Sequence, residues 1–279
     1  MVLKIVRRAN IMKKHRTFLS LTGLSILTPM LLVALLFLGC DPNPSSSPAP
    51  PQSESPSPAT VAMGGKIYDD WLRTTGAAAP EGNSPLWAAQ TTNQRKGKDT
   101  WRCKECHGWD YKGKDGDYGS GSHATGFPGV YEAAKSQTSA ELAATLKGSP
   151  NLNHDFSKYL NDDQISALVV FLKEGATIDV MQFIDYSTRK PNIADPTKGR
   201  ETFDSICAEC HGSDGKKLNT GSVERPEYVG TVSVDNPMEF IHKVRFGQPG
   251  AGMPAGVEHG WTIQNVLDVL AHAQTLPTS

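Results

Sequence analysis

One five-residue pattern occurs twice in the chain: residues 103–107 and residues 207–211 both read C-x-x-C-H. These two copies take four of the five cysteines, and the fifth, Cys40, ends a hydrophobic N-terminal segment. No pair of cysteines is therefore left for a structural disulfide. The fold has to be organised around these two stretches, because they hold the paired thiols and place a histidine directly beside each pair.

The C-x-x-C-H pattern is the attachment signature of c-type haem. Two cysteines three positions apart can each add their sulfur to one haem vinyl group, and the next histidine can bind the iron. A lone C-x-x-C is also found in redox dithiols, and two copies could form a four-cysteine zinc site. The histidine in both copies favours two covalently bound haem c groups. The residues are Cys103, Cys106 and His107 for the first group and Cys207, Cys210 and His211 for the second.

The length of 279 residues allows one or two domains, and the net charge is −1. Residues 1–39 contain six basic residues and no acidic residue, so the remainder has 22 basic and 29 acidic residues and a charge of −7. Phosphates would repel such a chain, which argues against nucleic acid as a partner. A mildly acidic surface suits basic redox partner proteins.

Residues 1–39 have the order of a secretory signal peptide: a basic head, then the uncharged apolar stretch Phe18–Leu38, then Gly39. The four residues 37–40, Phe-Leu-Gly-Cys, resemble a bacterial lipobox, which predicts that Cys40 is lipidated and becomes the first residue. The alternative is an uncleaved transmembrane anchor, because the apolar stretch is long enough to span a membrane. Both interpretations place the rest of the chain outside the cytoplasm, in the periplasm or at the cell surface, and attached to a membrane.

Residues 40–60 are rich in proline and serine and lack apolar residues to bury, so a disordered linker is expected there. Two domains are then expected, residues 61–180 and 190–279, joined by a connector around 176–194. Apolar spacing, capping residues and glycine stops predict the helices. Their expected ranges are 65–72, 138–147 (with Ser139 as N-cap), 161–173, 196–206, 237–246 and 261–275.

The two halves share an order: helix, C-x-x-C-H, glycine-rich loop, helix, loop, terminal helix. This is an internal repeat of roughly 100 residues. The loop before each terminal helix aligns by its Gly and Pro, at 148 and 150 in the first half and at 247 and 249 in the second. In that alignment His154 falls on Met253, six residues after its glycine.

This order resembles the small class I c-type cytochromes, which are all-α and carry a distal methionine in that loop. The resemblance implies an all-α fold with two tandem cytochrome c-like domains. It makes His107 and His211 the proximal iron ligands and Met253 the distal ligand of the second haem. The first domain lacks that methionine, and His154 stands in its place. The rivals are Met238 for the second haem and His123 or Met181 for the first.

Other residues near the motifs receive structural interpretations. Trp109, Tyr111 and Phe127 could cover a haem edge, and Trp101 could pack on the haem. His242, His259 and His272 are expected to be ordinary surface or partly buried histidines.

The hypothesis that follows is a membrane-tethered dihaem c-type cytochrome that transfers electrons in an extracytoplasmic respiratory or redox chain. A histidine pair gives a lower potential than a histidine–methionine pair, so the second haem would hold the electron more tightly. The alternatives are a dihaem peroxidase, a thiosulfate dehydrogenase, a haem-based sensor, or a subunit of a larger respiratory complex. Thiosulfate dehydrogenases use a distal cysteine, and the only cysteine outside the motifs is Cys40. An electron carrier is therefore favoured over a catalyst.

Overall fold

A computed structural model of the chain describes residues 55–279. The predicted signal peptide, Cys40 and residues 40–54 of the predicted linker lie outside the described residues. The described part is mostly helical, as predicted, and Ser53–Ser279 form one compact unit. Within it we call residues 58–179 the N-terminal half and residues 180–279 the C-terminal half. The domain boundaries expected from the sequence, 61–180 and 190–279, stay predictions.

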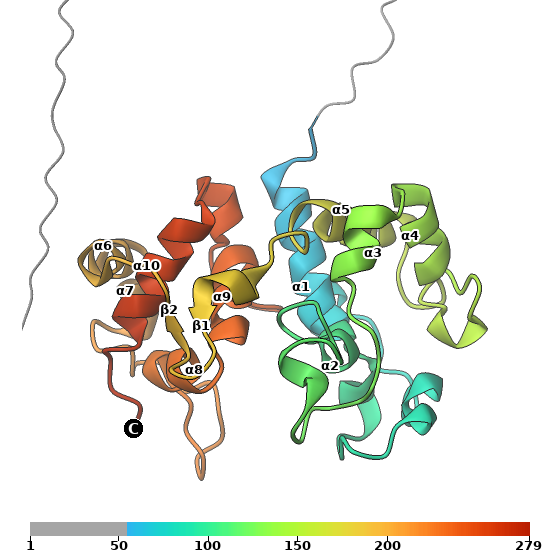
Figure 1. The fold of residues 1–279 in the computed structure, drawn as a ribbon, viewed down its shortest axis with the longest axis horizontal. Helices are drawn as coiled ribbons and strands as arrows, with labels where there is room; N and C mark the ends of the chain where they lie inside the picture. The colour runs from blue at the N-terminus through green and yellow to red at the C-terminus, as the bar shows by residue number, and fades with distance from the viewer. Residues whose placement is uncertain (1–54) are drawn as a thin grey trace, which may run out of the picture. The chain divides into compact units, whose positions relative to one another are not determined.

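The N-terminal half consists of five α-helices and several 3-10 turns (Figure 1). The α-helices are α1 (Pro58–Thr75), α2 (Cys103–His107), α3 (Tyr131–Ser136), α4 (Ser139–Leu146) and α5 (Asp162–Glu174). The 3-10 turns are η1 (Pro85–Ala89), η2 (Gly97–Trp101), η3 (Asp117–Gly119) and η4 (Leu152–His154).

The C-terminal half repeats this order of α-helices (Figure 1). Its α-helices are α6 (Pro196–Thr202), α7 (Ala208–His211), α8 (Val229–Asp235), α9 (Pro237–Phe246) and α10 (Ile263–Ala273). A π-helical turn, η6 (Phe203–Cys207), joins α6 to α7, and a 3-10 turn, η7 (Gly256–His259), precedes α10. The predicted connector holds a 3-10 turn, η5 (Val180–Phe183), and the short antiparallel strands β1 (Ile184–Asp185) and β2 (Lys190–Pro191).

Helix α1 begins at Pro58, inside the segment that was predicted to be a disordered linker. The Ser57 hydroxyl accepts a hydrogen bond from the Thr60 amide at 3.2 Å, and proline is well suited to the first helical position. Serine and proline, which by composition suggested a disordered linker, therefore form the start of a helix here. The helix ends at Thr75 and is capped by Gly76, whose φ of 70° is the left-handed conformation favoured by glycine.

Capping boxes fix the starts of α4 and α5. Thr138 exchanges hydrogen bonds with Glu141, and Asn161 does so with Gln164. Thr138 is thus the N-cap of α4, and the prediction that Ser139 caps this helix was wrong by one position.

In both halves the first and last helices pack closely because a glycine lies at the crossing. A Cβ on Gly64 of α1 would lie 2.1 Å from the Ala167 carbonyl oxygen of α5. A Cβ on Gly199 of α6 would lie 1.9 Å from the Asp268 carbonyl oxygen of α10. Four residues after each glycine, the aromatic side chains of Tyr68 and Phe203 are buried. The crossings are therefore equivalent features of the two halves.

Replacing Gly199 with alanine should lower the free energy of unfolding by about 1–3 kcal/mol, because the added methyl group overpacks the α6–α10 crossing. Denaturant unfolding of the purified protein measures this change. Gly252→Ala is the matched control, since Gly252 has open space around it and no left-handed φ. Equal stability of the two variants would show that the crossing tolerates a methyl group.

Candidate functional site: two C-x-x-C-H motifs

The first motif forms α2, a single short helix. Residues at positions i, i+3 and i+4 of a helix share one face, so Cys103, Cys106 and His107 point the same way. All three line one cavity of about 350 Å³. Most of its other lining side chains are apolar or aromatic, among them Trp101, Phe127, Leu142, Leu146, Phe156, Leu168 and Leu172. A cavity of this character suits a flat, largely apolar cofactor.

One ring nitrogen of His107 already has a protein partner. Its Nδ1–H donates to the Pro128 carbonyl oxygen at 2.7 Å. This leaves Nε2 as the free nitrogen of the ring, and metal-bound histidines usually donate their other nitrogen in this way. Burial lowers the pKa of His107 to about 4, so the imidazole is neutral and its free nitrogen can bind a metal.

His154 lines the same cavity from the loop after α4. Its Nδ1–H donates to the Thr145 carbonyl oxygen at 3.1 Å, which again leaves Nε2 free. The ring centres of His107 and His154 are 6.3 Å apart. A metal–imidazole bond of about 2 Å puts each ring centre about 3 Å from the metal, so two rings sharing one metal lie about 6 Å apart. The spacing of the two rings therefore fits one metal ion bound between them.

The thiols of the first motif are held in their protonated form. Burial raises the pKa of both Cys103 and Cys106 to about 12, which disfavours the reactive thiolate. Within residues 55–279, no group of three or more His, Cys, Asp or Glu side chains is placed to hold a metal ion. The two motifs are thus not brought together into the four-cysteine zinc site that the sequence left open.

Helix α1 holds the first motif from one side. The side chain of Arg102, the residue before Cys103, donates through Nε to the Asp69 carbonyl oxygen at 2.8 Å and pairs with the Asp69 carboxylate. Helix α1 is kinked at the neighbouring Asp70, where φ is −153°. Burial opposes the negative charge of Asp69, but Lys243 and Arg102 beside it lower its pKa. The motif is therefore anchored by a buried carboxylate that stays ionised.

The second motif lies at the η6–α7 junction and is more open. Cys207 is half-buried and Cys210 is exposed. The Nδ1 atom of His211 is buried and has no hydrogen-bond partner among the described residues, and burial lowers the pKa of this histidine. His107 donates to the Pro128 carbonyl, but no described residue offers such an acceptor to His211 at the second motif.

Met253 is half-buried in the loop after α9, where it packs against the core of the C-terminal half. Its rival Met238 is 4% exposed and lies within α9 as part of that core. Met253 is therefore the more accessible of the two thioethers. Its assignment as the distal ligand of the second haem stays a prediction, as does that of His154 for the first.

The remaining candidates lie elsewhere. His123 stacks on Tyr118 with ring centres 5.0 Å apart, and Met181 packs against the core of the C-terminal half, so neither lines the cavity. Phe127 does line it, as expected, whereas Trp109 and Tyr111 do not. Their side chains instead reach His242 of the C-terminal half.

His242 was expected to be an ordinary surface or partly buried histidine, and it is completely buried. The sequence carried one sign of this. Met238 and Phe246, four residues before and after His242, lie on its face of α9 and are both apolar, which is typical of a buried helix face.

The family comparison, the C-x-x-C-H motif and the helices around it support a c-type cytochrome domain over residues 194–271, for which covalently bound haem c and an electron-transfer role are implied. Over these residues the chain matches the family model described as Cytochrome C oxidase, cbb3-type, subunit III. No curated protein and no solved structure matches the chain. In residues 55–279, no helix combines the length and the apolar character needed to cross a membrane.

Proposed function

We propose that the protein is a membrane-tethered dihaem c-type cytochrome that transfers electrons in an extracytoplasmic respiratory or redox chain. Each half would form one cytochrome c-like domain. Cys103 and Cys106 would hold the first haem and Cys207 and Cys210 the second. The observation that carries the proposal is the pair of imidazoles, His107 and His154, whose ring centres lie 6.3 Å apart in the cavity beside the first motif.

Haem iron with protein ligands on both sides supplies one-electron chemistry with little structural change, whereas an open side suits binding or catalysis. Two fixed histidines therefore favour an electron carrier over a peroxidase or a gas sensor. The backbone carbonyls of Pro128 and Thr145 hold the two rings in place, and most of the cavity wall around them is apolar. Both features keep the ligand geometry constant during a change of charge.

The C-terminal site would use His211 and Met253. A thioether ligand raises the potential relative to a second imidazole. Electrons would therefore favour the C-terminal site over the N-terminal one.

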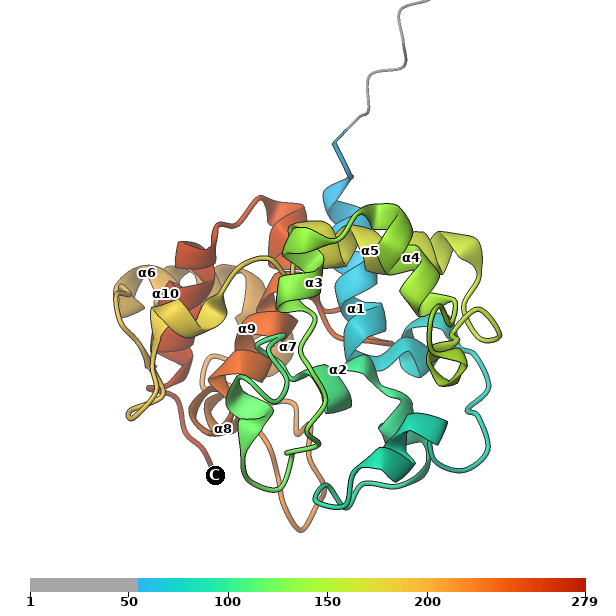
Figure 2. The same ribbon diagram turned by 45° about the vertical axis from the view of Figure 1, so that its right-hand side comes forward.

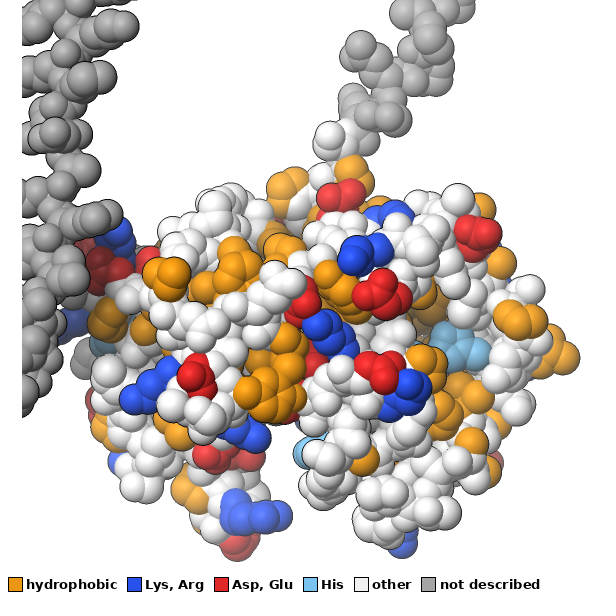
Figure 3. All heavy atoms as spheres, in the orientation of Figure 1, with side chains coloured by type: hydrophobic (Ala, Val, Ile, Leu, Met, Phe, Trp, Pro, Cys, Tyr) orange, Lys and Arg blue, Asp and Glu red, His pale blue; other side chains and the backbone are white. Residues whose placement is uncertain are grey.

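The partners would be redox proteins that meet the described part of the chain from solution. Figure 3 shows acidic and basic side chains intermingled on one face, with hydrophobic side chains between them. The tether would be the lipid on Cys40 or the apolar stretch Phe18–Leu38, both outside the described residues.

Mass spectrometry of the purified protein should show two added haem groups, and an optical redox titration should show two midpoints. Met253→Ala should lower the higher midpoint and leave the other unchanged, because it removes the soft ligand of one site. Met181→Ala is the matched control, since Met181 is also half-buried against the same core. A mass without two haems, or an unchanged titration in Met253→Ala, would contradict the proposal.

A further inference from the structure

The two halves share a buried interface formed by α9. This helix packs against α10 of its own half and against α1 of the N-terminal half (Figures 1 and 2). Phe246, at the end of α9, belongs to the hydrophobic core of the N-terminal half. In the other direction, Trp109 and Tyr118 belong to the core of the C-terminal half. Each half thus completes the core of the other.

His242 is the polar centre of this interface. Its Nε2–H donates to the Gly65 carbonyl oxygen of α1 at 3.0 Å, and its Nδ1 accepts the Tyr111 hydroxyl proton at 2.8 Å. Both ring nitrogens of a neutral imidazole are therefore satisfied, and both partners lie in the other half. Five aromatic rings have centres 5.0–5.9 Å from the imidazole. They belong to Tyr68, Trp109, Tyr111, Phe171 and Phe246.

The backbone of Tyr111 is held in an unusual conformation that serves this contact. Its φ is 67°, in the left-handed region that non-glycine residues rarely adopt. The Tyr111 carbonyl oxygen accepts hydrogen bonds from the amides of Val130 and Tyr131 at 2.7 and 2.9 Å, which fix the turn. Strain of this kind persists where the surroundings over-determine it. Here the left-handed backbone of Tyr111 accompanies a side chain whose hydroxyl reaches His242.

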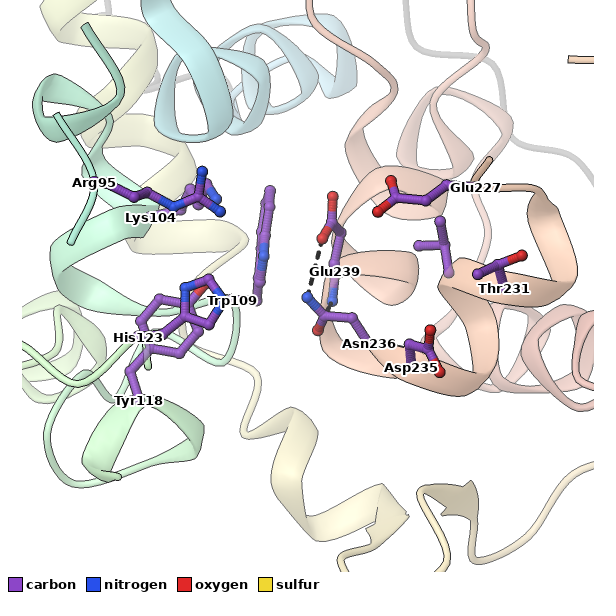
Figure 4. Close-up of a pocket in the computed structure, with 11 residues that line it drawn as sticks. Arg95, Lys104, Trp109, Tyr118, His123, Glu227, Thr231, Asp235, Asn236 and Glu239 are labelled. Carbon is purple, nitrogen blue, oxygen red and sulfur yellow. Dashed lines mark hydrogen bonds between the residues drawn. The ribbon is translucent and has the colours of Figure 1, made fainter. Parts of the chain in front are cut away.

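Trp109 connects the interface to the first motif. It follows His107 by two residues and is 1% exposed. The ammonium groups of Lys104 and Lys243 lie 4.9 and 5.2 Å from the centre of its ring. Figure 4 shows Trp109 between side chains of the N-terminal half, such as Arg95, and side chains of the C-terminal half, such as Glu239. Trp109 is therefore a packing element that lies between the two halves.

Charged groups add to the attachment. Lys243, the residue after His242, pairs with the buried carboxylate of Asp69 at 2.7 Å. Arg245 donates to the Gly175 carbonyl oxygen at 3.0 Å. Because Asp69 also pairs with Arg102 next to Cys103, the interface and the first motif share one network.

We propose that His242 is the positioning residue that fixes the two halves as one rigid body, so that electron transfer between the two sites needs no domain motion. This inference rests on the proposed dihaem function. One electron leaves the N-terminal site and one electron arrives at the C-terminal site. No bond forms or breaks, and the Tyr111 proton stays on its oxygen.

The test uses the full-length haem-loaded protein. After rapid photoreduction of one site, the rate of electron transfer to the other is measured at increasing glycerol concentration. In the wild type this rate should not depend on viscosity. In His242→Leu a slower, viscosity-dependent phase should appear, because the molecules whose halves are open must close before the electron crosses.

A second readout is independent of electron transfer. Loss of the two hydrogen bonds should raise the fraction of molecules with an open interface on the order of tenfold. Hydrogen exchange of the backbone amides in α1 and α9 should increase by the same factor. His259→Leu is the matched control, since His259 is exposed in the same half.

A wild-type rate that depends on viscosity would overturn the inference, as would unchanged exchange in His242→Leu. If the protein lacked two haems, the proposed function would fail. The exchange measurement would still show separately whether His242 joins the halves.

Discussion

Replacement of His154 with glycine is expected to open the first haem site to external ligands. The reduced wild-type protein should not bind carbon monoxide at this site if His107 and His154, which both line the cavity with ring centres 6.3 Å apart, bind the iron together. His154→Gly should bind one equivalent of carbon monoxide and should change from a six-coordinate to a five-coordinate optical spectrum. Added imidazole should restore the original spectrum, since the cavity keeps the space of the lost ring.

The matched control for this experiment is His123→Gly. His123 belongs to the same half and was a rival ligand, but it stacks on Tyr118 away from the cavity. This variant should keep the wild-type spectrum. Carbon monoxide binding by the wild type at the first site, or an unchanged spectrum in His154→Gly, would show that His154 does not bind the iron.

The second prediction with a large effect concerns acid stability. Burial lowers the pKa of His242 from 6.5 to about 3. The groups that face its imidazole inside the interface are Tyr111, Asp69, Lys243 and Arg245. Asp69 raises this pKa and the two cations lower it. In the unfolded chain the group would protonate at its ordinary pKa. Between these two pKa values the unfolded state therefore binds more protons than the folded state. The contribution of His242 to the free energy of unfolding is complete above pH 6.5 and is lost as the pH falls.

The expected loss is up to about 1.4 kcal/mol per pH unit, or roughly 3.5 kcal/mol between pH 6.5 and pH 4. Denaturant unfolding of the wild type and of His242→Leu, from pH 7 down to pH 4, measures it as the difference between the two proteins. The carboxyl of Asp69, whose pKa is also lowered, loses stability in the same direction, but it does so in both proteins. A difference that stays constant with pH would contradict a neutral, buried His242.

Much of the local structure could be predicted from the sequence, because its causes are local. The bounds of α9 agree with the predicted range, and α5 begins within one residue of it, since Asn161 is a recognisable cap. The alignment of His154 with Met253 also depends only on the order of elements, and both residues do follow equivalent helices, α4 and α9.

The interface between the halves could not be predicted in this way. It joins residues separated by more than a hundred positions, such as Tyr111 and His242, and no local pattern specifies that pairing. Trp109 and Tyr111 were therefore assigned to the haem edge, because the motif was their only known neighbour. The hydrogen bonds that orient His107 and His154 were missed for the same reason: their acceptors are backbone carbonyls, which any residue supplies.

The two residues between the cysteines differ in accessibility between the two motifs. In the first motif Lys104 and Glu105 are 4% and 0% exposed, and Glu105 pairs with Lys104 and Arg95. In the second motif Glu209 is exposed and Ala208 is half-buried. An attachment enzyme that binds the two residues between the cysteines could reach the second copy in the folded protein but not the first. We therefore expect maturation to follow an order, in which the first copy receives its thioether bonds before the halves close over it.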